Sequence, residues 1–210
     1  YCHGRGVKVH VTLNTLVADR ETPALLRQLR EIAESGADVL IVQDLGVAAL
    51  CRECCPSIPI HASTQLSIHN AAGARAMKDL GFSCIVLARE LTAREIAAIH
   101  REVGGEIELE TFVHGALCMS LSGQCYLSAM LGERSGNRGL CAQPCRLDFR
   151  SPHGREYALS LKDLSLVDRM KELEETGVSY LKIEGRMKRP EYVAAATAAC
   201  RAARDGLPYD

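Results

Sequence analysis

Short runs of apolar, mostly β-branched residues recur along the chain, and helical patterns separate them. We predict strands at seven of these runs: Val7–Leu13, Val39–Val42, Ile58–His61, Cys84–Leu87, Ile107–Val113, Tyr157–Leu161 and Tyr180–Ile183. Several runs are continuously hydrophobic, which is typical of strands buried on both faces of a parallel sheet. The pattern therefore predicts an α/β protein built from repeated strand–helix units.

The segments between the strands carry the start and stop signals of helices. Thr22 precedes a proline, Thr92 begins a capping-box pattern, and Pro190 opens an alanine-rich segment. All three features are common at helix N-termini. At three junctions a helical pattern ends at a glycine and a strand follows closely; these glycines are Gly36, Gly81 and Gly177. Glycine permits the left-handed conformation that ends many helices.

Repeated units of this kind form either a barrel or an open doubly wound sheet. No Gly-x-Gly-x-x-Gly follows a predicted strand, which disfavours the dinucleotide-binding open sheet. We therefore predict an α/β, TIM-barrel-like but incomplete fold of about seven strands, in one domain over residues 1–210. Because the chain opens on Tyr1 without an initiator methionine, we expect a fragment that lacks its first strands. Its sheet edge should then be exposed near Val7–Leu13.

Polar side chains follow most predicted strands at their C-terminal ends, where barrel enzymes place their active sites. The candidate acid–base groups are His114, Glu110, Glu184, Lys162 and Asp163. The candidate substrate-binding groups at these ends are His61, Gln65, Arg89 and Arg186. A simpler interpretation, that strand ends are polar because loops are polar, accounts for part of this pattern.

The strand–helix rhythm is interrupted by a cysteine-rich insert over residues 115–150. Its four cysteines, spaced Cys-x6-Cys-x15-Cys-x3-Cys, are Cys118, Cys125, Cys141 and Cys145. Four thiolates suit a [4Fe–4S] cluster or a tetrahedral zinc ion. The six-residue gap of the first pair is wide for a zinc ribbon, so the spacing favours the cluster. Four buried thiols that pack as small hydrophobic side chains are a further alternative.

The charge balance restricts where an anionic partner can bind. The 25 Lys and Arg residues nearly match the 26 Asp and Glu residues, so a basic surface has to be local. One basic group, between residues 134 and 155, includes Arg138, Arg146 and Arg155, and a second includes Arg186 and Lys188. Such groups bind phosphates, although a solvated basic rim explains them equally well.

The cellular compartment of a protein decides whether its cysteines form disulfides. No stretch is long and apolar enough to span a membrane, and no signal peptide is visible, so we expect a cytoplasmic protein. The ten cysteines are then thiols, metal ligands or catalytic groups rather than disulfides. Cys84 in a strand and Cys200 on a helix read as core residues.

Six segments resemble motifs of the U32, or collagenase-like peptidase, family: Val11–Thr15, His61–Gln65, Glu110–Cys118, Ser122–Ser128, Asn137–Arg146 and Lys182–Lys188. The resemblance covers nearly the whole chain. The wording Cys-Ala-Gln-Pro-Cys-Arg at Cys141–Arg146 is most similar to the branch that hydroxylates a 23S rRNA cytidine.

The resemblance implies oxygen-independent hydroxylation of an RNA base, either an rRNA cytidine or a tRNA wobble uridine; another branch hydroxylates a ubiquinone precursor. It implies a cluster held by Cys118, Cys125, Cys141 and Cys145, and it links the RNA-modifying members to prephenate as a metabolic requirement. The family name implies the main alternative, peptidase activity. Neither His-Glu-x-x-His nor Gly-x-Ser-x-Gly is present, so no motif supports proteolysis. A non-enzymatic domain with structural zinc is the third alternative.

Overall fold

A computed structural model describes residues 1–154 and 156–209. The strands are β1 His10–Leu13, β2 Val39–Val42, β3 Ile60–Ala62, β4 Cys84–Val86, β5 Glu108–Gly115, β6 Leu164–Ser165 and β7 Tyr180–Glu184. The helices are α1 Thr22–Glu34, α2 Leu45–Cys54, α3 Ala71–Asp79, α4 Ala93–Val103, α5 Leu127–Gly132, α6 Met170–Glu175 and α7 Pro190–Arg204.

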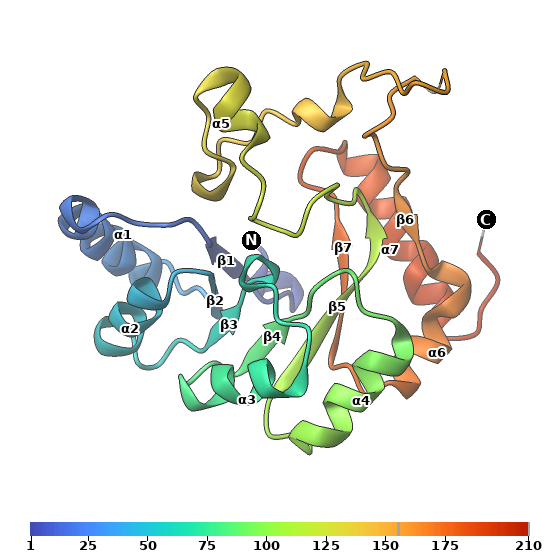
Figure 1. The fold of residues 1–210 in the computed structure, drawn as a ribbon. Helices are drawn as coiled ribbons and strands as arrows, with labels where there is room; N and C mark the ends of the chain where they lie inside the picture. The colour runs from blue at the N-terminus through green and yellow to red at the C-terminus, as the bar shows by residue number, and fades with distance from the viewer. Residues whose placement is uncertain (155, 210) are drawn as a thin grey trace.

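The strands form one curled sheet that resembles part of a barrel (Figure 1). β1 to β5 pair in chain order and in parallel, β7 also pairs in parallel with β5, and the two-residue β6 is antiparallel to β5. Within the described residues β1 pairs only with β2. The predicted incomplete barrel with an open edge at its first strand is therefore confirmed, although that strand begins at His10 instead of Val7.

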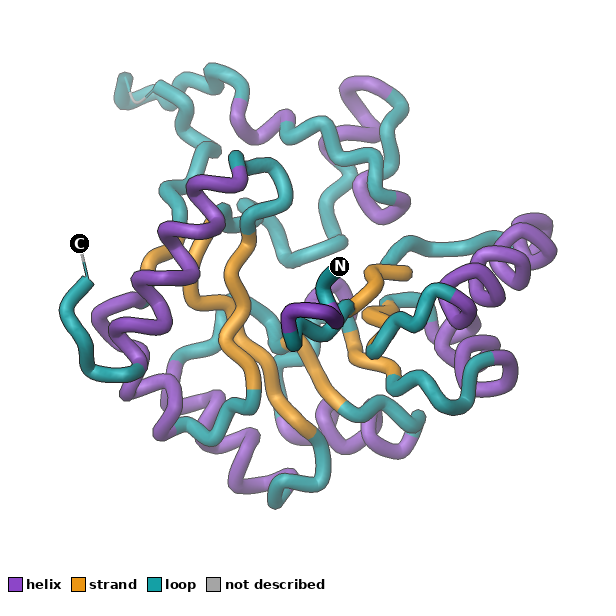
Figure 2. Tube along the Cα trace, turned by 180° about the vertical axis from the view of Figure 1, so that it is seen from behind, coloured by secondary structure: helices purple, strands orange, loops and turns teal. Residues whose placement is uncertain are grey.

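The hydrophobic core lies between the sheet and the helices outside it (Figure 2). Leu40 of β2, Ile85 of β4 and Leu109 of β5 are fully buried. Burying each such side chain contributes about 1.5–3 kcal/mol. A smaller cluster joins β5 to α6 and α7 through Val113, Met170 and other side chains. No helix in the described ranges is long and apolar enough to cross a membrane.

The predicted helix signals are largely confirmed. Gly36, Gly81 and Gly177 adopt φ of +76°, +84° and +86°, which is the left-handed conformation expected of a helix stop. The Thr92 hydroxyl accepts the Glu95 N–H at the start of α4. Thr22 was predicted as the cap residue before the helix, and this is wrong. It is already the first residue of α1, because a 3-10 turn at Asp19–Glu21 precedes the helix.

The strand predicted at Tyr157–Leu161 is wrong. Tyr157 has a φ of +49°, which a strand does not accommodate. The Ala158 N–H donates to the Phe149 carbonyl at 2.7 Å, which ties this run to the insert instead of the sheet. The short strand β6 follows it three residues later, at Leu164.

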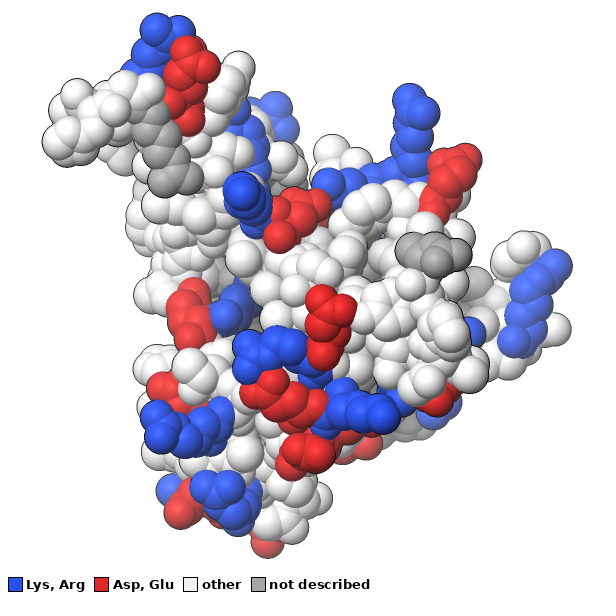
Figure 3. Space-filling view, turned by 90° about the vertical axis from the view of Figure 1, so that its right-hand side faces the viewer, with Lys and Arg blue, Asp and Glu red and all other residues white. Residues whose placement is uncertain are grey.

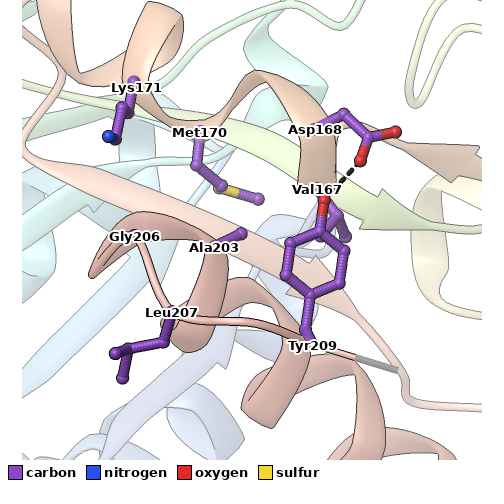
Figure 4. Close-up of a pocket in the computed structure, with 8 residues that line it drawn as sticks. All are labelled: Val167, Asp168, Met170, Lys171, Ala203, Gly206, Leu207 and Tyr209. Carbon is purple, nitrogen blue, oxygen red and sulfur yellow. Dashed lines mark hydrogen bonds between the residues drawn. The ribbon is translucent and has the colours of Figure 1, made fainter.

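The C-terminal segment folds back onto α6 and closes a pocket of about 300 Å³ (Figure 4). Leu207 and Tyr209 line it opposite Val167 and Met170. The Tyr209 hydroxyl donates a hydrogen bond to Asp168 Oδ1. Residues 206–209 are thus held against the second core cluster.

Gly115 ends β5 at a close approach to β7. Its φ is +112°, and a Cβ there would lie 2.2 Å from the Glu184 carbonyl oxygen. We predict that Gly115→Ala lowers the free energy of unfolding by about 3–5 kcal/mol. The cost of backbone strain at this positive φ and the cost of the clash with the Glu184 main chain add to one another. Gly104→Ala is the control: its φ is +60° with nothing within 4 Å, so it should cost about 1–2 kcal/mol. Equal losses in urea unfolding would contradict the close-approach argument.

Candidate functional site

The insert lies over the C-terminal ends of the strands (Figure 1). It leaves the sheet after Gly115 and contacts the ends of β1 and β2 through Asn137, whose carbonyl accepts the Leu16 N–H at 3.2 Å and the Gln43 side-chain amide at 3.0 Å. Arg138 donates to the Leu16 carbonyl at 2.8 Å and pairs with Glu21. These contacts fix the insert across the barrel mouth.

Backbone amides of the insert point at two of its sulfur atoms. The Leu127 N–H contacts Cys125 Sγ at 3.4 Å, and the Gln143 N–H contacts Cys141 Sγ at 3.4 Å. Ser128 supports the second site, because its hydroxyl accepts the Ala142 N–H at 2.9 Å and contacts Cys141 Sγ at 3.9 Å. N–H and O–H groups around sulfur atoms are commonly found as outer-shell contacts of metal ligands.

The four insert thiols lie near one another but do not form a tight group. Burial raises the pKa of Cys145, and charges on Cys118, Cys141 and Cys125 raise it further, while Arg146 opposes them. Among the described residues, one group of three potential ligand atoms lies within 4.8 Å of one another, and it includes none of these cysteines. The cofactor that these four thiols bind stays a prediction.

Arg89 and Arg146 bring unused hydrogen-bond donors to the barrel mouth. Arg89 stacks over the Phe112 ring at 4.3 Å, and its Nε is buried without a partner. Burial lowers the pKa of Arg89, opposed by Cys118, Glu184 and Glu90. Arg146 donates to the Leu117 carbonyl at 2.8 Å, while its other terminal nitrogen is buried without a partner.

A pocket of about 380 Å³ opens beside Arg89. Its lining residues are Arg89, Glu90, Leu117, Cys118, Met119, Ser120 and Leu121. Cys118, a predicted metal ligand, and the half-buried Arg89 therefore line the same space. Such a pocket can hold an anionic group next to the insert thiols.

The other predicted acid–base groups fall into two places. Inside the sheet, Glu110 is 5% exposed and pairs with Lys182 of β7 at 2.6 Å. At the rim, Asp163 accepts hydrogen bonds from Lys188 at 2.8 Å and Tyr192 at 3.5 Å. The lysine ammonium holds the pKa of Asp163 below its usual range. The His114 ring lies 5.6 Å from that of Tyr192, and its Nδ1 is buried without a partner.

The remaining candidates are less closely grouped. Glu184 accepts the Arg186 N–H at 3.0 Å, and Lys162 and Arg186 are exposed. Gln65 accepts the Asn14 side-chain amide at 2.7 Å. His61 lies in the middle of β3 and is 2% exposed, so the structure places it inside the sheet and not at a strand end. The roles assigned to these residues stay predictions.

The sequence interpretation missed several polar residues on the faces of β5 and β7 that are turned towards the barrel interior. Glu108 accepts the Tyr180 hydroxyl hydrogen bond at 3.1 Å, and Lys182 lies beside Glu110. The available signal was alternation: polar residues occupy every second position at Glu108 and Glu110 of β5 and at Tyr180, Lys182 and Glu184 of β7. Side chains of period two share one face of a strand, and here that face is the barrel interior.

Several members of the basic groups are engaged by acidic partners. Arg150 pairs with Asp148 and Glu156, and Arg138 pairs with Glu21; Arg155 lies outside the described residues. On the side shown in Figure 3, Lys and Arg are interspersed with Asp and Glu. The buried donors of Arg89 and Arg146 are therefore stronger candidates for an anion site than this mixed surface.

These features define an open β/α barrel protein whose C-terminal mouth is covered by a cysteine-bearing insert. The model of peptidase family U32 matches residues 1–208. The chain belongs to that family. Its sheet is similar to that of the U32 peptidase Mk0906, with a TM-score of 0.59 at 17% identity over 90% of this chain and 74% of the other.

Curated relatives carry two kinds of name. The chain is 41% identical to the 23S rRNA 5-hydroxycytidine C2501 synthase of Escherichia coli over 99% of its length and 32% of the relative. It is 35% identical to the tRNA hydroxylation protein P1 of Bacillus subtilis, over 98% and 51%, and to a collagenase of Porphyromonas gingivalis, over 91% and 50%. The chain thus spans only about a third to a half of these relatives.

The Glu21–Arg138 pair predicts a pH-dependent attachment of the insert. The Arg138 guanidinium, helped by the Ala18 N–H, holds the pKa of Glu21 at about 2, below its ordinary 4.5. A lowered carboxyl pKa contributes stability above pH 4.5 that is lost as the pH falls towards 2. At pH 4.5 pepsin should cleave the insert faster in Glu21→Gln than in wild type, and near pH 2 the two rates should converge. Glu172→Gln, which removes an exposed pair with Arg169, should not change cleavage of the insert.

Proposed function

We propose that this protein is part of an RNA hydroxylase that acts on an rRNA cytidine or a tRNA uridine, with a [4Fe–4S] cluster on Cys118, Cys125, Cys141 and Cys145. One observation carries the proposal: Cys118 and Arg89 line the same pocket at the barrel mouth. The names of the E. coli and B. subtilis relatives supply the substrate class.

The side chains at the mouth suit an anionic, hydrogen-bonding substrate. Arg89 and Arg146 each have a buried donor without a partner, and a phosphate or carboxylate satisfies such donors with two parallel hydrogen bonds. We assign them to substrate binding. We assign proton transfer to His114 and to Glu184, whose charge acts on Arg89.

Hydroxylation of a base has a fixed balance. Replacing C–H by C–OH with the oxygen of water releases two protons and two electrons, so an electron acceptor is required. When bound, an iron–sulfur cluster supplies electron transfer. An organic oxygen donor would replace both water and acceptor; prephenate, the metabolite that the family resemblance implies, stays a prediction in this role.

No geometric feature favours the peptidase alternative. In the described ranges His114 makes no hydrogen bond to a hydroxyl or thiol group, so no nucleophile–base pair is assembled around it. Cys118, the nearest thiol in sequence, belongs to the predicted cluster. The argument against the structural-zinc alternative is the six-residue gap between Cys118 and Cys125, which is wide for a zinc ribbon.

The first test concerns the metal. Anaerobically purified protein should contain iron and sulfide, and Cys118→Ala or Cys145→Ala should lose most of both, because a site with three thiolates holds the cluster poorly. Cys54→Ala is the matched control, since Cys54 is an exposed cysteine outside the insert. Zinc in the four-thiolate site, with no iron, would exclude the cluster.

The second test concerns the reaction. Deleting the gene should remove the mass of one oxygen atom from a specific nucleotide of 23S rRNA or tRNA, as measured by mass spectrometry of digested RNA. The full-length protein should restore it, as should the Cys54→Ala variant, whereas Cys141→Ala and Arg89→Gln should not. Unchanged RNA masses together with iron-independent cleavage of gelatin would instead support the peptidase.

A further inference from the structure

A second group of potential metal ligands lies on the face of the sheet that is turned towards the barrel interior. His61, Cys84 and Glu108 each offer one ligand atom, and these three atoms lie within 4.8 Å of one another. Residues 1–154 and 156–209 contain no other group of three or more His, Cys, Asp and Glu side chains that meets this distance. The group includes none of the four insert cysteines.

The sheet register brings the three side chains together. His61 of β3 is the partner of Cys84 of β4, and Cys84 is the partner of Glu108 of β5. Partner residues on adjacent parallel strands point to the same face, so three consecutive strands present a nitrogen, a sulfur and an oxygen at one level. Cys84 and Glu108 are the first residues of their strands. The group therefore lies at the N-terminal end of the sheet, opposite the insert.

Burial makes this group unusual for ordinary core packing. His61 is 2% exposed, Cys84 is fully buried, and His61 Nδ1 has no hydrogen-bond partner. Buried ring nitrogens normally have a partner, and one without it calls for a missing water or ion. The rings of His10 and Tyr180 flank His61, with centroids at 5.4 Å and 5.9 Å.

The third ligand connects the group to solvent. Glu108 is exposed, so an ion can enter from the N-terminal end of the barrel. The Tyr180 hydroxyl donates to Glu108 Oε2 at 3.1 Å. Hydrogen bonds of this kind commonly orient carboxylates that bind metals.

We propose that His61, Cys84 and Glu108 bind one divalent ion of the zinc class. Imidazole, thiolate and carboxylate are the donors that zinc takes, at about 2.0–2.3 Å, whereas magnesium and calcium require oxygen ligands. Closing the donors around the ion needs movements of roughly 1 Å, because tetrahedral ligands at those bond lengths lie about 3.3–3.8 Å apart. His10 or water completes the coordination. The bound ion cross-links β3, β4 and β5. This inference does not depend on the proposed function.

The test uses anaerobic protein whose insert is loaded with iron, so that the insert thiols are occupied. Zinc is titrated and the bound metal counted by mass spectrometry. Wild type should bind a single zinc ion, and Glu108→Gln should bind it at least about 10-fold more weakly. Glu106→Gln is the matched control: Glu106 is an exposed carboxylate two residues before Glu108, and its loss should leave the affinity unchanged.

Cobalt identifies the sulfur ligand. Co²⁺ should give a thiolate-to-cobalt absorption band that Cys84→Ser removes and Cys200→Ser, at another buried cysteine, retains. Zinc binding should also persist in a Cys118→Ser/Cys141→Ser variant without iron. Equal zinc affinity of Glu108→Gln and Glu106→Gln, or loss of zinc in the Cys118→Ser/Cys141→Ser variant alone, would overturn the proposal. Neither result bears on RNA hydroxylation.

Discussion

The parallel pairing of β5 with β7 is the constraint on which the rest of the site depends. It sets Glu110 beside Lys182 at 2.6 Å and brings the Gly115 backbone against the Glu184 carbonyl. The register shifts between Phe112 and His114, and such irregularities re-aim side chains next to active sites. As a result Glu110 stays inside the sheet, while His114 reaches the rim beside Tyr192.

The same pairing forces the insert out of the sheet. β5 ends at Gly115 and its partner β7 begins only at Tyr180, and between them only the two-residue β6 pairs with β5. The chain between them has little sheet edge to pair with, so it crosses the barrel mouth and is held at the far side by Asn137 and Arg138. The insert therefore joins both halves of the curled sheet, and its cysteines lie where the strand ends converge.

The sequence predicted the helices and strands better than the contacts between them. Six of the seven predicted strands overlap observed ones, because continuous apolar runs and glycine stops are local signals. The run at Tyr157–Leu161 failed because an apolar run does not specify a partner, and here Phe149 of the insert supplies the hydrogen bond. The cysteine spacing indicated a metal centre, but the level shared by His61, Cys84 and Glu108 depends on strand register. Register joins residues far apart in sequence, which one-dimensional patterns do not encode.

The charges at the barrel mouth distinguish two roles for its arginines. If the proposed cluster is bound, the cluster and its four thiolates together carry a net negative charge, which a nearby guanidinium would stabilise at a distance. Arg89 and Arg146 act electrostatically on Cys118 and Cys145 respectively, which meets that need without a hydrogen bond to sulfur. Their unpartnered donors, Nε of Arg89 and a terminal nitrogen of Arg146, are not needed for this effect. Burying such donors costs about 1–3 kcal/mol each, and the anionic substrate of the proposed function would remove that cost by accepting from them. Under that proposal, charge compensation and substrate binding use the same two side chains through different atoms.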